Sequence, residues 1–419
     1  MMSYFEIRGG KRLNGRIKIQ GAKNSALPVL SAALLSNEQC VIHNCPELTD
    51  VAAAADILSH LGCGINIEGN TITVDSSKAD GYEISDELMT KMRSSIVFLG
   101  AIIARFGRAV MSFPGGCELG PRPIDIHLSS LRQMGVVIDE EHGKIICSAP
   151  NGISGVDIHL PIPSVGATEN IMLTAVAANG ITTIRNAARE PEITDLADFL
   201  NMCGARIIGA GDSIVTVLGG RPLHGCEFSV IPDRIVAATY LAACAATGGR
   251  ITIDDVIPSH LWPIIPVLAE AGCDVTVGSG EVTVLAPERL RRVKQITTMA
   301  YPGFPTDAQP PVMAMLTVAE GTSVFIENVF QNRYRHTAGL SRMGAKLKVE
   351  GRVCIVEGVP SLYGSAVDAT DLRGGAAIAV AGLAAKGITR ISRIEHILRG
   401  YEKFDEVLSA LGADIKLIN

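Results

Sequence analysis

Apolar positions along the chain follow a pattern that returns six times, about every 70 residues. Each copy has a helix-like stretch that ends in an apolar residue and Gly, followed by two runs of alternating apolar residues. A Gly just past a helix supplies the left-handed backbone of a C-terminal cap, and period-2 alternation predicts half-buried strands. The glycines of the six copies are Gly62, Gly135, Gly204, Gly272, Gly344 and Gly412. The pattern therefore predicts one small α/β unit used six times.

Each copy also contains a second stretch, rich in small apolar residues, that is apolar nearly all round. Such helices are expected to be buried rather than amphipathic. The six predicted buried helices cover residues 26–35, 95–104, 169–178, 235–246, 311–319 and 375–385. For each unit, the pattern thus predicts the order strand, buried helix, strand, outer helix, strand, strand. Helices inside and sheets outside would be an inverted arrangement of layers.

The length of 419 residues is too great for one core, since domains usually run to about 100–200 residues. Six units divide naturally into two groups of three. Boundaries are expected where a unit begins, near Gly21-Ala22 and Pro232-Asp233. The last copy ends at Asn419, so the N-terminal strands are expected to complete the C-terminal group. This predicts a discontinuous domain of residues 1–22 and 233–419, and a second domain of residues 23–232.

Composition narrows the class of protein. Apolar residues make up 47% of the chain, which is enough for two large cores, and the net charge of −6 argues against a nucleic-acid partner bound through bulk charge. No apolar run approaches the roughly 20 residues of a membrane span. The ten cysteines show no metal-type spacing and are interpreted as small buried hydrophobes in a reducing cytoplasm. We expect no membrane span, no metal and no cofactor.

The standard nucleotide and zinc motifs are missing from the sequence, which contains no GxxxxGK(S/T), no GxGxxG after a strand and no HExxH. A Gly- and Pro-rich segment, 113–123, instead carries Cys117 and interrupts the repeat. It has the composition of a lid with a reactive thiol, whose pKa could be shifted by a cation such as Arg122. A structural loop with an incidental cysteine is the alternative.

Charged residues stand at several predicted helix starts. Lys23 and Asn24 follow a strand, where a helix N-terminus and a cation favour an anion, although an ordinary capped helix start explains them too. Asp307 is a candidate general base or a helix cap, and Asp233 and Asp371 hold comparable places. Surface charge is the alternative for the cations of the predicted anion pocket, which are Lys23, Arg93, Arg122, Arg333 and Arg399.

Together these segments resemble the UDP-N-acetylglucosamine 1-carboxyvinyltransferases, enolpyruvyl transferases of the EPSP synthase superfamily that open bacterial peptidoglycan synthesis. The resemblance covers essentially the whole chain. It rests on residues 21–24, the Cys117 loop with 122–127, and on 164–168, 187–192, 304–307, 370–373 and 399–402. It implies a two-domain inside-out α/β barrel that closes on substrate.

The resemblance also implies an activity. The enolpyruvyl group of phosphoenolpyruvate would pass to the 3-hydroxyl of UDP-N-acetylglucosamine by addition and elimination, with release of phosphate. Cys117 would protonate the methylene carbon and would react with the epoxide antibiotic fosfomycin. Asp307 would take the hydroxyl proton, and Lys23, Arg122 and Arg399 would hold phosphate and carboxylate. The implied substrate-binding set is Lys23, Asn24, Arg93, Arg122, Pro123, Ile124, Asp125, Ile126, Ser164, Val165, Gly166, Asp307, Val329, Arg333 and Asp371.

Two positions depart from the family pattern. Ile162, with Pro163, stands where Lys is often found before Ser-Val-Gly, and Gln331 stands where Glu is common. These departures could mark a paralogue of the main enzyme. An enolpyruvyl transferase for a different acceptor and a catalytically silent regulatory paralogue are the competing hypotheses, and the cations and acids at Lys23, Cys117, Asp307 and Arg399 argue against the silent one.

Overall fold

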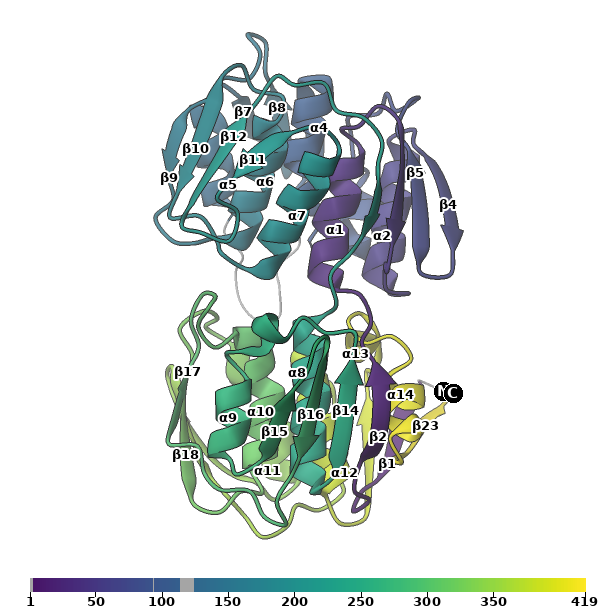
Figure 1. Cartoon of the computed structure of the whole chain (residues 1–419), viewed down its shortest axis with the longest axis vertical. Helices are drawn as coiled ribbons and strands as arrows, with labels where there is room; N and C mark the ends of the chain where they lie inside the picture. The colour runs from purple at the N-terminus through teal and green to yellow at the C-terminus, as the bar shows by residue number, and fades with distance from the viewer. Residues whose placement is uncertain (1–2, 93, 114–123) are drawn as a thin grey trace. The chain divides into compact units, whose positions relative to one another are not determined.

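The computed structural model describes residues 3–92, 94–113 and 124–419. These residues form two compact units (Figure 1). The N-terminal unit comprises residues 21–113 and 124–231, and the C-terminal unit comprises residues 3–20 and 232–419. The Cys117 loop, with the site candidates Cys117, Arg122 and Pro123, lies outside the described residues, as does Arg93.

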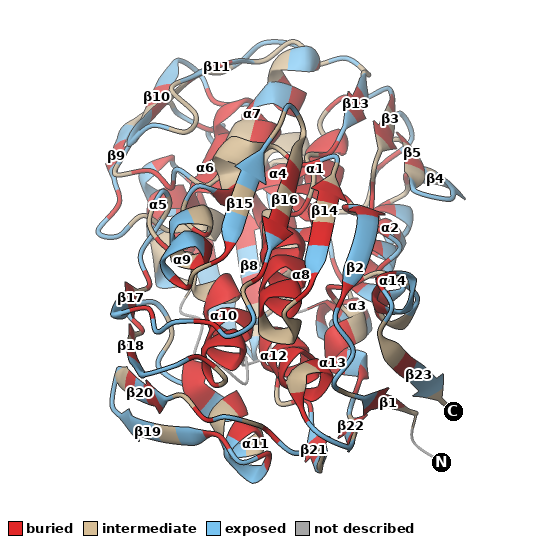
Figure 2. Cartoon of the chain, turned by 60° about the horizontal axis from the view of Figure 1, so that its bottom comes forward, coloured by how far each residue is buried: buried red, intermediate tan, exposed pale blue. Residues whose placement is uncertain are grey.

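Buried helices form the centre of each unit. In the N-terminal unit these are α1 (Lys23–Ala33), α4 (Phe98–Phe106) and α6 (Val165–Ala175), and in the C-terminal unit α8 (Arg234–Thr247), α10 (Gln309–Leu316) and α12 (Leu372–Ala384). Figure 2 shows α8, α10 and α12 almost entirely in the colour of buried residues. Small side chains let these helices approach closely: a Cβ added at Gly100 of α4 would lie 2.4 Å from the carbonyl oxygen of Asn170 in α6.

Sheets and outer helices surround the buried helices of the N-terminal unit. Its sheets have the orders β13-β3-β5-β4, β6-β8-β7 and β11-β12-β10-β9. The strands are β3 (Gln39–His43), β4 (Gly64–Glu68), β5 (Thr71–Asp75), β6 (Arg108–Ser112), β7 (Val137–Glu141), β8 (Lys144–Ser148), β9 (Asp157–His159), β10 (Ile181–Arg185), β11 (Arg206–Ile208), β12 (Ile214–Leu218) and β13 (Glu227–Ser229). The other helices are α2 (Thr49–His60), α3 (Asp86–Lys91), η1 (Ser95–Val97), α5 (Asp125–Gln133) and α7 (Pro191–Met202).

The C-terminal unit repeats this plan with sheets ordered β15-β16-β14-β2, β17-β18-β20-β19 and β21-β22-β1-β23. The strands are β1 (Tyr4–Arg8), β2 (Asn14–Lys18), β14 (Arg250–Asp254), β15 (Asp274–Val277), β16 (Glu281–Leu285), β17 (Gln295–Thr297), β18 (Thr322–Ile326), β19 (Lys346–Glu350), β20 (Val353–Glu357), β21 (Ala366–Asp368), β22 (Ile388–Ser392) and β23 (Asp414–Ile418). The other helices are η2 (Pro258–Leu261), α9 (Ile265–Glu270), η3 (Thr306–Ala308), η4 (Arg333–His336), α11 (Thr337–Arg342), α13 (Glu395–Leu398) and α14 (Phe404–Ala410).

The repeat is visible in the backbone itself. All six repeat glycines have φ values between +92° and +101°, a region that favours Gly. In every copy the residue after the Gly donates its N–H to the carbonyl of a buried Leu five residues earlier, as a Schellman cap does. These leucines are Leu58, Leu131, Leu200, Leu268, Leu340 and Leu408. The predicted sixfold α/β unit is therefore confirmed, down to the same terminating hydrogen bond.

Strands near the two chain ends and near the unit boundaries complete the sheets. Strand β1 pairs with both β22 and β23, so the N-terminal segment completes the last sheet (Figure 2). Strand β2 precedes α1 but pairs with β14, whereas β13 precedes α8 but pairs with β3. Each of these pairings therefore joins segments of one unit that lie far apart in the sequence. The α/β fold class is confirmed, with the sheets remaining separate rather than joined into one hydrogen-bonded barrel in the described part of the chain.

Candidate active site

Acidic residues stand at the starts of the three buried helices of the C-terminal unit. Asp233 Oδ1 accepts the backbone N–H groups of Ile235 and Val236 at 2.8 and 3.0 Å. Asp371 Oδ1 accepts those of Arg373 and Gly374 at 3.1 and 3.0 Å. Both residues are therefore helix N-caps, as their alternative interpretation predicted.

Asp307 behaves differently. It lies inside the short helix η3, whose N-cap position is held by Pro305, so the interpretation of Asp307 as a helix cap is wrong. Its carboxylate instead accepts hydrogen bonds from two guanidiniums, from Arg333 Nη2 at 2.6 Å and from Arg373 Nε at 3.3 Å. Charge-assisted bonds of this kind are strong and fix the orientation of a carboxylate.

The two arginines beside Asp307 are themselves buried. The side chain of Arg333 is 1% exposed and that of Arg373 is 4% exposed, so the surface-charge interpretation of Arg333 is wrong. Arg333 also donates from Nε and Nη2 to the carbonyl of Thr306, at 3.1 and 2.8 Å. Burial alone would lower the pKa of Arg373, but Tyr401, Asp307 and Asp233 raise it on balance. The Arg373 guanidinium, which bonds to the Asp307 carboxylate, therefore stays charged at neutral pH.

Further side chains of the C-terminal unit support this pair. Asp371 Oδ1 lies 3.9 Å from Arg333 Nη1. The ring of His336 bonds through Nδ1 to the Arg333 carbonyl at 3.1 Å. Burial lowers the pKa of His336 to about 4, against the opposing charge of Asp371, so this imidazole is neutral. The Arg373 guanidinium lies 5.3 Å from the centre of the Tyr401 ring, within cation–π range.

Two other predicted positions belong to the same unit. Val329 is 48% exposed, and its backbone N–H donates to the buried carboxylate of Glu327 at 2.8 Å. The Thr306 hydroxyl bonds to the same carboxylate at 3.0 Å, so Glu327 joins the Val329 loop to the segment before Asp307. Arg399 is partly exposed and follows α13 directly, at its C-cap.

In the N-terminal unit, Lys23 is buried at the first position of α1. Its ammonium lies 3.0 Å from Asp50 Oδ2, and the two side chains are 11% and 2% exposed. The N-cap residue of α1 is Ala22, which has no side-chain cap bond, so the interpretation of this segment as an ordinary capped helix start is wrong. Asn24, the next residue, is exposed.

The predicted segments 124–126 and 164–166 are brought together by their helix starts. Ile124 is the N-cap of α5 with Asp125 and Ile126 in its first turn, and Ser164 caps α6 by accepting the N–H of Ala167 at 3.4 Å. A Cβ added to Gly166 would lie 2.9 Å from His127 Cε1. Asn170 Nδ2 bridges the Gly166 carbonyl and His127 Nδ1, at 3.2 and 3.0 Å.

The electrostatics of this junction keep its histidine neutral. Burial lowers the pKa of His127 to about 4, with Asp125 acting in the opposite direction. Burial also raises the pKa of Glu169, in the same helix α6, with Glu192 and Glu190 adding to the shift. The start of α6 thus lies against the neutral imidazole of His127 in α5, and α6 itself carries a carboxyl, of Glu169, that resists ionisation.

Comparison with known proteins shows the family to which the chain belongs. The family model described as EPSP synthase (3-phosphoshikimate 1-carboxyvinyltransferase) matches residues 7–408. UDP-N-acetylglucosamine 1-carboxyvinyltransferase 2 of Caldanaerobacter subterraneus subsp. tengcongensis is 50% identical over 414 residues, covering 99% of each chain. UDP-N-acetylglucosamine 1-carboxyvinyltransferase 1 of Symbiobacterium thermophilum is 46% identical over 419 residues, covering 99% of this chain and 95% of that protein. The chain belongs to the UDP-N-acetylglucosamine 1-carboxyvinyltransferase family.

Solved structures agree with this family. The enolpyruvyl transferase NikO from Streptomyces tendae superposes with a TM-score of 0.90 at 28% identity, covering 99% of each chain. An EPSP synthase from Acinetobacter baumannii gives a TM-score of 0.77 at 20% identity over all of both chains, which shows a shared fold. None of the described helices is both long enough and apolar enough to cross a bilayer.

Sequence analysis missed two partners of the proposed carboxyvinyltransferase residues. Arg373 was recognised only as part of a matching segment, yet its guanidinium reaches Asp307. Asp50, the partner of Lys23, lies in the first turn of α2 and belongs to no motif. The spacing of Arg373 from the Asp371 cap could have indicated a side chain at the same helix end, whereas nothing in the sequence links Asp50 to Lys23.

Proposed function

We propose that this chain transfers the enolpyruvyl group of phosphoenolpyruvate to the 3-hydroxyl of UDP-N-acetylglucosamine and releases phosphate, the first committed step of peptidoglycan synthesis. The observation that carries the proposal is the 50% identity, over 99% of both chains, to a protein of that name. The contacts of Asp307 with two arginines and of Lys23 with Asp50 support it, because an acid–base reaction on anionic substrates needs an oriented carboxylate and a fixed cation.

The proposed reaction is an addition followed by an elimination. The acceptor oxygen bonds to C2 of phosphoenolpyruvate while Asp307 takes the hydroxyl proton and Cys117 gives a proton to C3. The C2–O bond to phosphate then breaks, a proton leaves C3 and the double bond returns. Two buried guanidiniums support the role of Asp307, because their contacts orient its carboxylate.

Substrate charges are matched by cations in this proposal. Lys23, Arg122 and Arg399 hold the phosphate and carboxylate of phosphoenolpyruvate. The burial of Lys23 beside Asp50 supports a fixed ammonium rather than a mobile surface charge. Arg373 adds a further donor, since its Nη1 is buried without a hydrogen-bond partner among the described residues.

The nucleotide sugar would be bound by residues at helix starts and in loops. The proposed contacts are Asn24, Arg93, Arg122, Pro123, Ile124, Asp125, Ile126, Ser164, Val165, Gly166, Asp307, Val329, Arg333 and Asp371. The N-terminus of α6 suits a diphosphate because its free N–H groups carry partial positive charge. Ile162 is 58% exposed just before this helix, so the Lys usual at that position would be replaced by an apolar surface.

The remaining parts of the proposal follow from the family. The domains are residues 1–22 with 233–419, and residues 23–232. Cys117 is the site at which a fosfomycin-type epoxide would react. Because the ten cysteines show no disulfide framework, we place the chain in the cytoplasm, with roles in cell-wall synthesis, cell shape and division.

Acceptor choice tests the proposed function. The purified chain would be given phosphoenolpyruvate with UDP-N-acetylglucosamine, with shikimate 3-phosphate, or with no acceptor, and phosphate would be measured over time. We expect phosphate release with UDP-N-acetylglucosamine only. Release with shikimate 3-phosphate instead would show a different acceptor, and no release with either would show a silent paralogue.

A further inference from the structure

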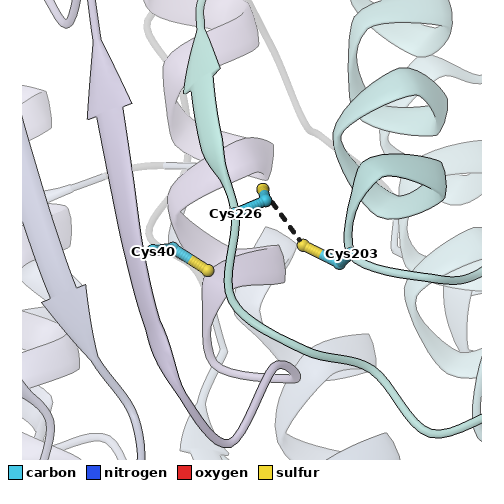
Figure 3. Close-up of side chains that lie close together, drawn as sticks. All are labelled: Cys40, Cys203 and Cys226. Atoms are coloured by element: carbon cyan, nitrogen blue, oxygen red, sulfur yellow. Dashed lines mark hydrogen bonds between the residues drawn. The ribbon is translucent and has the colours of Figure 1, made fainter.

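Three cysteines from distant parts of the sequence meet in the N-terminal unit (Figure 3). Cys40 is the second residue of β3, Cys203 follows α7, and Cys226 directly precedes β13. Their sulfur atoms all lie within 4.8 Å of one another, and Cys203 Sγ is 3.4 Å from Cys226 Sγ. In the described residues this is the only group of three or more potential metal-ligating side chains this close together.

The spacing matches the requirement of a metal ion. With metal–sulfur bonds of about 2.3 Å, three sulfurs around one ion lie about 4 Å apart. Cys40 and Cys203 are 0% and 1% exposed, whereas Cys226 is partly exposed and offers a path of entry.

Packing alone does not require sulfur at these positions, because the same three-way junction recurs in other repeats. Each junction is marked by one backbone bond: Cys226 O accepts from Val41 N at 2.9 Å, as Val156 O does from Thr183 N. The residues that correspond to Cys203, Cys226 and Cys40 are Leu61, Tyr82 and Ala109 in one junction, Met134, Val156 and Thr182 in a second, and Met343, Ser365 and Thr389 in a third. Among these junctions, thiols fill all three positions only where β13 joins β3.

We infer that Cys40, Cys203 and Cys226 form a three-thiolate binding site for a thiophilic d10 metal ion such as Zn²⁺. Soft thiolate ligands select ions of this class. Each thiol that becomes a ligand releases one proton, so binding strengthens as pH rises. The ion joins the end of α7 to β3 and to β13, the strand that precedes the crossing into the C-terminal unit, and it stabilises the folded N-terminal unit by mass action. The site is independent of the proposed transferase chemistry.

Cadmium binding to the full chain tests this site, with Cys117→Ser in every sample so that this thiol does not contribute. The chain is reduced with a phosphine and titrated with Cd²⁺, and the near-ultraviolet thiolate-to-metal absorption is followed. We expect one tightly bound Cd²⁺ per chain, displaced by Zn²⁺. Replacing each ligand by a residue that fills the same position elsewhere, in Cys40→Ala, Cys203→Met and Cys226→Val, is expected to weaken binding by about 100-fold or more.

A buried cysteine outside the cluster provides the matched control. Cys63 follows the repeat Gly of the first copy, and Cys63→Ala should bind Cd²⁺ as the reference chain does. Zn²⁺ should raise the melting temperature of the reference and of Cys63→Ala, but not of the three ligand variants, whose metal-free melting shows that they fold. Absence of the absorption in the reference would overturn the inference. So would folded ligand variants that bind like the reference, or an equal loss of binding in Cys63→Ala.

Discussion

Arg333 donates from Nη2 to the carboxylate of Asp307 across 2.6 Å, and the Arg333 side chain is only 1% exposed. A second guanidinium, of Arg373, approaches the other carboxylate oxygen at 3.3 Å. The two contacts fix the direction of this carboxylate, which is what the proposed general base requires.

Removing the Asp307 carboxylate should slow the reaction without the loss of a helix cap. Asp307→Ala is expected to reduce turnover by about 10²–10⁴-fold, because a general base contributes that much. Asp233→Ala is the matched control, since Asp233 caps α8 and has no proposed contact with substrate. The control should lose about 1 kcal/mol of unfolding free energy. Rates and melting temperatures would be measured on the same samples. Unchanged turnover in Asp307→Ala would contradict the assignment.

The guanidinium of Arg333 should matter through Asp307. Arg333 binds the Thr306 carbonyl with two nitrogens and Asp307 with one of them, a fork that Lys cannot reproduce. Arg333→Lys is expected to lower kcat by about 10²-fold, because the base is misplaced. In a double-mutant cycle the effect should largely disappear on the Asp307→Ala background. Additive losses in kcat would show that Arg333 acts independently of Asp307.

Lys23 and Asp50 allow structural and chemical roles to be separated. Lys23→Met leaves the buried Asp50 carboxylate without this ammonium, so we expect both stability and activity to fall, stability by about 3–5 kcal/mol as for a broken buried pair. Adding Asp50→Leu should recover much of the stability, measured by urea unfolding, but not the activity. Recovery of turnover in the double variant would assign Lys23 a structural role only.

The buried His336 should make stability depend on pH. Burial lowers its folded pKa to about 4 from an ordinary value of 6.5, so between these values the unfolded chain binds more protons. Its contribution, about 3 kcal/mol, is therefore present above pH 6.5 and lost as pH falls through about 4. His336→Asn should remove this slope. Burial raises the pKa of Asp195 to about 7, so Asp195 contributes the opposite slope. The measurement is therefore the difference in unfolding free energy between the unchanged chain and His336→Asn as the pH is varied.

Local patterns predicted the fold because each repeat carries its own signals. Neighbouring residues determine three features of each repeat: the Gly, the Leu whose carbonyl accepts the N–H five residues later, and the alternating strands. Local patterns could not predict the partners of two strands. The pairing of β2 with β14 and of β13 with β3 depends on contacts across more than 180 residues of sequence. The thiol cluster follows from that pairing, and the spacing of Cys40, Cys203 and Cys226 along the chain gives no hint of it.

Site residues that belong to a sequence motif could be predicted. Their contact partners from other parts of the chain could not. The segment around Asp307 indicated an acid that could be a cap or a base, and only the structure shows that its carboxylate contacts Arg333 and Arg373 and caps no helix. Burial of Arg333 could not be foreseen, because a charged side chain at a loop is usually solvated. The roles of Cys117, Arg93, Arg122 and Pro123 stay predictions from the sequence.

The bond that breaks in phosphoenolpyruvate tests the central claim most directly. Phosphoenolpyruvate labelled with oxygen-18 in the oxygen between C2 and phosphorus would be turned over with UDP-N-acetylglucosamine, and both products would be weighed by mass spectrometry. Enolpyruvyl transfer predicts that the label leaves in the phosphate, and that the nucleotide sugar gains an unlabelled enolpyruvyl group. Label retained in pyruvate, with a phosphorylated acceptor or free unlabelled phosphate, would mean that the O–P bond breaks and would contradict the account.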